Sequence, residues 1–552
     1  MKRLIKYISI VFIAGALLNS CETTDLDLRI SPNDLASNQA DPNLLLVAVQ
    51  LAYGTNMQVF SNLSAELTRI DYMFGRNYFN NYPGSVLNGV WSRTYSSGGN
   101  GLGDGVGVGI LTNLQNLEAL NADPDLNLNF HVAVTKTLYA HQLMLLVDFV
   151  GEAAFSQAGQ PAEFPAPVLD SGQEVYNAAL NLLDEAESLL AANPNTIGVT
   201  DLFYNEDVSK WRKLVNTLRL KAYYTTDNAA AFNQVIAGGN FISSPEDDFF
   251  VRYGTSELQP DDRHPDYASD YTPSGANIYQ SNWIMETMLE NNDPRIRYYF
   301  YRQVSSTPGA DGAPNEEALA CSLAVPPQHF IDGGFTYCAV PNGYWGRTHG
   351  NNEGTPPDNF LRTAVGVYPA GGRFDDNGFD GVGLGLGGGG AGIEPFIMSS
   401  YVDFWRGYMA TSDADKANFM RAGLQKSIAT VQSFGALDGG ADFSFAPTAA
   451  DVTAYIDGIV NAFNAGSAED KENIFAEQYF STLYGGASEA WTYYRKTGFP
   501  NTLFPNWELN PGPFPLSFLY PQNEVVTNPN LSQKNDQAQP VFWNTGGCPT
   551  CY

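Results

Sequence analysis

The sequence predicts an all-α protein in which a scaffold of helical repeats carries one large, irregular insertion. Apolar residues recur at helical spacing across residues 41–226 and again across residues 394–500, which is typical of amphipathic helices. Residues 227–393 lack this period and instead contain proline and glycine clusters with scattered aromatic side chains. The pattern therefore indicates a helical scaffold with a large loop-rich insertion.

The first twenty residues have the features of a secretory signal peptide. A positive head of two lysines and one arginine precedes an apolar run that ends at Leu18, and the run is too short to span a bilayer as a stable helix. The segment Leu18-Asn19-Ser20-Cys21 resembles a bacterial lipobox. We expect Cys21 to become the acylated first residue of the mature chain; the alternative is an ordinary signal peptide with an incidental cysteine. Residues 21–40 are polar and are expected to form a tether next to the lipid.

The first helical stretch follows this tether. Asp41-Pro42 predicts a helix start, because aspartate caps a helix and proline suits its first position. Val175 and Trp211 head two similar apolar stripes 36 residues apart, close to the repeat length of tetratricopeptide arrays. Asp170 and Ser171 precede the first stripe as possible caps. Helices are expected at residues 110–121, 130–150, 173–191, 208–226, 394–411, 413–434, 449–464 and 469–496.

The remaining segments complete a single domain at residues 41–552. The insertion at 227–393 is rich in Trp, Tyr and Phe, which argues against disorder, and long irregular segments in ordered chains commonly carry function. Residues 501–552 are rich in proline and asparagine and are expected to form coil over the surface. Trp211, Trp405 and Trp491 lie on helical faces and are expected in the core.

Charge limits the possible partners. The net charge of −30 becomes −33 when the three basic residues of the signal peptide are removed. Such a surface repels nucleic acid and anionic lipid head groups, which excludes DNA or RNA as a partner. Membrane attachment must therefore depend on the lipid at Cys21 and not on a basic patch.

Four cysteines remain in the mature chain besides Cys21. An even number in an exported protein favours disulfides, and sequence neighbours suggest Cys321 with Cys338 and Cys548 with Cys551, although three pairings are open. A bridge from Cys321 to Cys338 would contribute about 3 kcal/mol. The alternative is a four-cysteine zinc site, but the first two cysteines lie too far apart for a metal-binding knuckle.

Motifs for catalysis, cofactors and metals are scarce. The sequence contains neither HExxH nor GxSxG, and its five histidines do not pair on one helical turn. The acidic run Asp375–Asp380 departs from the EF-hand register because Phe379 occupies a ligand position, so a solvated turn is expected there. We expect no enzyme, no cofactor and no metal, although a glycosidase pair could hide among the 59 carboxylates.

Several segments in order along the chain resemble the SusD/RagB nutrient-binding outer-membrane lipoproteins of Bacteroidetes. One segment, VGEAAF at residues 150–155, departs from the GDVPY-like run that is frequent in the family. The segments that match, besides the lipobox, are Leu26-Asp27-Leu28, KWRKLVNTLRLKAYY (210–224), NGYWGRTHGN (342–351), EPFIMSSYVDFWRGYMA (394–410), EQYFSTLYGGASEAWTYYRKTGFP (477–500) and LYPQNEVVTNPNL (519–531).

The resemblance implies a tetratricopeptide-like helical-repeat superhelix with a large irregular, loop-rich insertion, and it implies a specific function. Members of the family capture an oligosaccharide or peptide outside the cell and deliver it to a SusC-like TonB-dependent β-barrel in the outer membrane. They are not enzymes, and a lipid anchor holds them on the outer membrane, facing the exterior. The alternatives are a surface glycan-processing hydrolase and an adhesion lipoprotein without a transport partner.

Sugar capture requires flat apolar rings against sugar faces and planar polar groups for the hydroxyls. The loop after the first helix and the insertion both contain this mixture. The candidate ligand-binding residues are Asn77, Tyr78, Trp91, Trp283, Tyr344 and Trp345.

Overall fold

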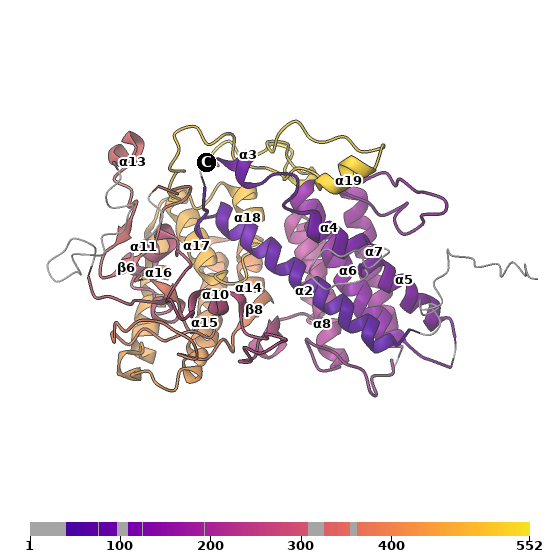
Figure 1. Cartoon of the computed structure of the whole chain (residues 1–552), viewed down its shortest axis with the longest axis horizontal. Coiled ribbons are helices and arrows are strands. Elements are labelled where there is room, and N and C mark those ends of the chain that lie inside the picture. The colour runs from indigo at the N-terminus through magenta and orange to yellow at the C-terminus, as the bar shows by residue number, and fades with distance from the viewer. Residues whose placement is uncertain are drawn as a thin grey trace, which may run out of the picture. The chain divides into compact units, whose positions relative to one another are not determined.

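Helices make up about half of the described chain, and many consecutive helices pack side by side (Figure 1). The computed structural model describes residues 40–75, 77–96, 109–123, 125–192, 194–306, 325–353 and 361–551. Pro42–Tyr552 forms one compact unit, separate from Met1–Asp41. The predicted signal peptide, Cys21 and nearly all of the tether lie outside the described residues.

The N-terminal helices form one layered group. Each of α5 to α9 packs on the next, and α2 lies across α5 and α6. Ser171 and Glu174 form a reciprocal capping box at the start of α7, so the predicted cap is confirmed. The helices are α2 (Pro42–Leu67), α3 (Tyr78–Asn81), α4 (Asn88–Tyr95), α5 (Ile110–Asn121), α6 (Asn129–Val150), α7 (Gly172–Ala191), α8 (Val208–Thr225) and α9 (Ala229–Gly238).

Helix α2 is long and apolar enough to cross a membrane by length and composition alone. Half of its most apolar window is buried inside the protein. Its polar Gln50 is also buried and donates to Asp201 Oδ1 at 2.8 Å. These contacts identify α2 as a core helix of the scaffold.

The C-terminal helices form a second group, in which α15 packs against α14, α16 and α17 (Figure 1). Helix α18 returns to α2 and joins the two groups. Trp211, Trp405 and Trp491 are fully buried, as predicted. The helices are α14 (Ser399–Tyr408), α15 (Asp413–Ser433), α16 (Ala449–Ala465), α17 (Ala468–Thr482), α18 (Ala490–Thr497) and α19 (Gln522–Thr527).

The segment between the two groups contains short elements. Its helices are α10 (Pro265–Asp270), α11 (Asn282–Glu290), α12 (Ile296–Tyr299) and α13 (Gln328–Gly333). The strands of the chain form antiparallel pairs: β1 (Glu152–Ala153) with β2 (Asp170–Ser171), β3 (Phe249–Arg252) with β8 (Ile393–Ile397), β4 (Phe300–Tyr301) with β7 (Ala364–Val365), and β5 (Ala339–Val340) with β6 (Tyr344–Trp345).

Four predicted boundaries were wrong. The expected helix at 394–411 starts only at Ser399, because residues 393–397 pair with β3 as strand β8. The expected helix at 469–496 is two helices, since a Cβ at Gly486 would lie 2.4 Å from the Pro395 carbonyl oxygen and the chain must turn there. Helix α9 lies within the expected insertion, and α19 within the expected coil.

A fully buried ion cluster links three helices of the scaffold. Lys221 Nζ of α8 lies 3.1 Å from Asp148 Oδ2 of α6 and 3.2 Å from Glu489 Oε1, next to α18. Tyr176 and Trp543 also donate to Asp148 Oδ1, at 2.5 and 2.8 Å. Burial opposes the charge on Lys221, but the two carboxylates hold its pKa above the usual value.

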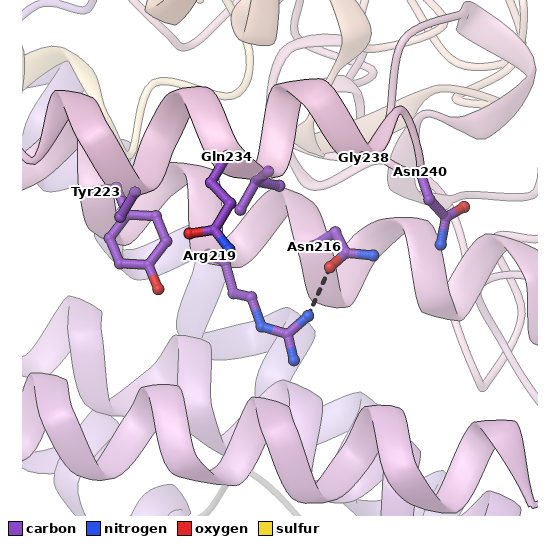
Figure 2. Close-up of a pocket in the computed structure, with 8 residues that line it drawn as sticks. Asn216, Arg219, Tyr223, Gln234, Gly238 and Asn240 are labelled. Carbon is purple, nitrogen blue, oxygen red and sulfur yellow. Dashed lines mark hydrogen bonds between the residues drawn. The ribbon is translucent and has the colours of Figure 1, made fainter.

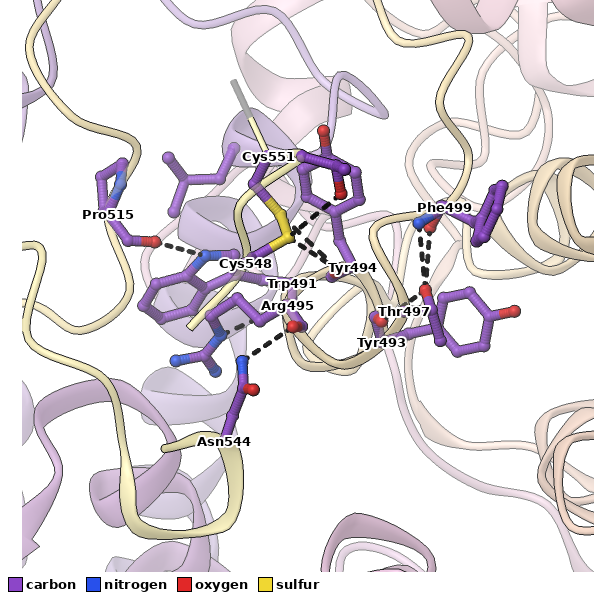
Figure 3. The surroundings of a disulfide bond; sticks show 12 residues. Trp491, Tyr493, Tyr494, Arg495, Thr497, Phe499, Pro515, Asn544, Cys548 and Cys551 are labelled. Atoms are coloured by element: carbon purple, nitrogen blue, oxygen red, sulfur yellow. Dashed lines mark hydrogen bonds between the residues drawn. A yellow bond between two sulfur atoms is a disulfide. The ribbon is translucent and has the colours of Figure 1, made fainter. Parts of the chain in front are cut away.

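The C-terminal coil is held against α18 (Figure 3). Cys548 and Cys551 form a disulfide, and both sulfur atoms lie within 3.7 Å of the Tyr494 carbonyl oxygen. Asn544 donates to the Arg495 carbonyl at 2.7 Å. Cys338 is also disulfide-bonded, while its predicted partner Cys321 lies outside the described residues.

Candidate ligand-binding cleft

A cleft of about 730 Å³ lies between the insertion and the loop before α16. Pockets for small ligands have volumes of about 300–1,000 Å³, so its size suits a ligand of a few sugar rings. Its walls come from α11, α12, the turn before β6, and residues 375–379 and 444–451. The aromatic and polar residues that line it include Arg297, Arg302, Asn342, Tyr344, Asn377, Phe379, Ser444, Phe445 and Asp451.

Aromatic rings and guanidinium groups alternate in this cleft. The Arg302 guanidinium lies 4.9 Å from the ring centre of Tyr344 and 5.1 Å from that of Phe379. Arg297 lies 5.6 Å from the ring centre of Phe445, which is 41% exposed. The cleft therefore offers an open ring next to fixed planar donors, which is the combination that binds sugars.

Arg302 fixes the position of two other segments of the cleft, at Asn342 and at residues 375–377. It donates to Asp375 Oδ2 at 2.6 Å, to the Asn342 carbonyl at 2.9 Å and to Asn377 Oδ1 at 2.5 Å. Asp375 is the first residue of the acidic run Asp375–Asp380, which was considered as a calcium site. It is fully buried and forms an ion pair with Arg302. Within the described residues, no group of three or more His, Cys, Asp or Glu side chains could hold a metal ion.

Of the candidate residues, the structure brings Tyr344 into the cleft. The next residue, Trp345, points to the other side of the short strand β6, because successive strand residues face opposite ways. Trp345 is fully buried and donates to the Ser306 carbonyl at 3.1 Å. Burial also raises the pKa of Tyr344, so its hydroxyl stays protonated.

The other candidates lie away from this cleft. Trp283 and Trp91 are buried and donate to the Thr502 carbonyl and to Glu524 Oε2, at 3.0 and 3.2 Å. Tyr78 is buried against His349 and Phe514. Asn77 caps α3 by accepting from the Asn80 amide at 2.9 Å. These contacts explain the four side chains as packing and capping residues and give no support for ligand contact.

A second hollow, of about 320 Å³, lies between α8 and α9 (Figure 2). Its walls are mainly polar, with Tyr223 as the one aromatic residue among those that line it. Arg219 donates to Asn216 Oδ1 at 2.5 Å and to Asp184 Oδ1 at 2.7 Å. This hollow offers a sugar fewer ring faces than the cleft does.

Comparison with protein families is decisive for the fold. A family model described as "Starch-binding associating with outer membrane" matches residues 62–316 and 396–521, more than half of the chain. The chain belongs to the SusD-like family. The resemblance to SusD/RagB proteins and the predicted all-α fold class are thereby confirmed. Comparison with curated proteins finds no match.

Solved structures share the SusD-like fold over nearly the whole chain. A chitin-binding protein is 19% identical, with a TM-score of 0.61, and covers 91% of this chain and 100% of its own. A SusD homologue from Bacteroides fragilis is 17% identical, with a TM-score of 0.59 and coverage of 92% and 99%. A SusD/RagB family protein from Bacteroides thetaiotaomicron is 17% identical, with a TM-score of 0.61 and coverage of 93% and 100%.

Sequence reasoning missed several residues of the SusD-like cleft. Phe445 lies in the short 3-10 helix Phe443–Phe445, between two segments predicted as scaffold helices. Phe443 and Phe445 could have been recognised as candidate ligand-binding residues, because they precede Thr448 in a polar stretch and neither belongs to the apolar stripe of a helix. Arg297 and Arg302 gave no comparable signal, because only the fold places them between aromatic rings.

Proposed function

We propose that this protein is a surface lipoprotein, anchored through Cys21, that captures an oligosaccharide in the cleft at Tyr344 and Phe445. It would deliver the ligand to a SusC-like TonB-dependent β-barrel of the outer membrane. The family description names starch binding and outer-membrane association, and one similar structure is named a chitin-binding protein. The observation that carries the proposal is the exposed Phe445 ring beside the fixed guanidinium of Arg297.

The carboxylates of the cleft favour binding over hydrolysis. A glycosidase needs a carboxylic acid whose pKa is raised and a second carboxylate across the scissile bond. Asp293 is held by Arg295 at 2.5 Å, and the Thr448 hydroxyl lowers the pKa of Asp451. Neither of these two lining carboxylates has the environment of a general acid, which supports a binding role.

Replacing Phe445 with alanine should weaken oligosaccharide binding by about tenfold or more, because the open ring would be lost. Isothermal titration with starch-derived and chitin-derived oligosaccharides would measure the loss. Phe443→Ala is the matched control: Phe443 belongs to the same short helix and is 42% exposed, but it packs on Phe374 outside the cleft. Equal affinities for wild type and Phe445→Ala would contradict the proposal, and binding of peptides alone would replace the sugar by a peptide ligand.

A transport role predicts a membrane partner. When the lipidated protein is tagged in its host and the outer membrane is solubilised gently, a TonB-dependent barrel should co-purify in stoichiometric amount. Mass spectrometry of the eluate would identify it. If the chain eluted alone, under conditions that keep a known complex of a SusD-like protein and its barrel together, the adhesion or hydrolase alternatives would be favoured.

A further inference from the structure

Four carboxylates from distant parts of the chain share an enclosed cavity of about 180 Å³, which we call the acidic cavity. Glu66 lies at the end of α2, Asp71 follows it, Asp266 belongs to α10, and Glu394 belongs to β8; Figure 1 labels these three elements. The residues that line the cavity include no lysine, arginine or histidine. The fold therefore gathers four carboxyl groups here without supplying a lining cation.

The carboxylates are close enough to act on one another. Burial is the main cause that raises the pKa of Asp71 to about 8, and the charges of Asp266 and Glu66 add to it. Burial raises the pKa of Glu394 as well, with contributions from Asp266 and Asp71. Burial thus disfavours the charged form of these carboxyl groups, and a bound cation would stabilise that form.

Two buried polar atoms in the acidic cavity, one on Glu394 and one on Gln280, make no hydrogen bond. Glu394 is 4% exposed, and its Oε1 atom accepts no hydrogen bond. The nearest basic group to Glu394 is His264, whose Nε2 lies 3.8 Å from Glu394 Oε2 and whose pKa is lowered by burial. Gln280 is equally buried, and its Nε2 atom donates to no protein group. A buried acceptor and a buried donor thus face the space where a ligand would lie.

The opening of the acidic cavity is aromatic. Tyr72 and Tyr279 line it with ring centres 5.9 Å apart, and Phe74 packs on Tyr72 while remaining 60% exposed. Asp266 is half exposed and marks the route to solvent. The guanidinium groups of Arg362 and Arg347 lie 4.0 and 4.5 Å from the ring centre of Tyr279, so the rings left to a ligand are those of Tyr72 and Phe74. A ligand with a flat body at these two rings and a positive group inside fits this arrangement.

We propose that the acidic cavity binds the primary ammonium group of an amino sugar. No described group of His, Cys, Asp and Glu side chains has metal-binding geometry, so an organic cation fits the spacing better than a metal ion. Glu394 accepts the ammonium at the base, and the rings of Tyr72 and Phe74 contact the sugar. The inference that the ligand carries an ammonium group rests on the carboxylates alone, whereas the inference that it is a sugar rests on the proposed function.

Matched ligands test the inference. Glucosamine should bind the full chain about tenfold or more tightly than N-acetylglucosamine, which has the same ring without the charge. Equal affinity for the two sugars would overturn the ammonium assignment. Binding of glycinamide as tightly as glucosamine would overturn the sugar assignment. Titration of an uncharged oligosaccharide tests the cleft separately, so failure here leaves the proposed function standing.

A variant pair tests the residue that carries the inference. Glu394→Gln should weaken glucosamine binding by about tenfold, because an amide cannot ionise to pair with the ammonium, and it should keep the melting temperature, because the amide has nearly the shape of the carboxyl group it replaces. Glu163→Gln makes the same change of net charge at an exposed position and should leave glucosamine affinity unchanged. A folded Glu394→Gln variant that binds glucosamine as wild type does would overturn the proposal.

Discussion

Replacing Lys221 with methionine should lower the free energy of unfolding by about 3–5 kcal/mol. The Lys221 ammonium is fully buried between Asp148 and Glu489, and its removal leaves two buried carboxylates without their counter-ion. Asp148 keeps donors from Tyr176 and Trp543, but one oxygen of Glu489 already lacks a hydrogen bond. The uncompensated charge of Glu489 is therefore the main cause of the loss, which urea denaturation would measure.

Two further variants separate this cause from a general loss of packing. Lys221→Met combined with Glu489→Gln should recover part of the lost stability, because the unpaired charge is neutralised. Lys471→Met breaks a pair with the exposed Asp413 and should leave the denaturation midpoint near that of wild type. A Lys221→Met protein with the wild-type midpoint would show that the buried cluster adds no net stability.

The sequence predicted elements whose signals are local. The Ser171–Glu174 capping box and the apolar stripes of α7 and α8 lie within single turns or helices, so periodicity located them. Strand β8 was missed because its pairing depends on β3, more than a hundred residues earlier. Lys221 and Glu489 each lie in a segment that resembles the family, yet only the fold shows that they form an ion pair.

The site was harder to predict for the same reason. Tyr344 and Trp345 are adjacent in sequence, and residue type alone made both of them candidates. The alternation of β6 places one in the cleft and buries the other, which composition cannot show. The insertion also has buried rings of its own, such as Trp283, so a tryptophan within an irregular segment is a weak indicator of ligand contact.

Replacing Arg302 with methionine should both destabilise the protein and abolish oligosaccharide binding. Arg302 is the cation bound to the fully buried Asp375, and its other donors hold the Asn342 carbonyl and Asn377. After the change, the nearest remaining cation is Arg297, 3.9 Å from Asp375. We expect a stability loss of about 3 kcal/mol, because the buried charge of Asp375 loses its closest counter-ion. Thermal denaturation and titration with an oligosaccharide would measure the two effects.

The double variant Arg302→Met, Asp375→Asn distinguishes stability from recognition. Neutralising Asp375 removes the buried charge and should restore most of the melting temperature, because the remaining amide needs no counter-ion. Binding should stay lost, since the segments at Asn342 and at residues 375–377 still lack the guanidinium that joins them. If the double variant regained both stability and affinity, Arg302 would act only as the counter-ion of Asp375, and the ligand would have to lie elsewhere on the insertion.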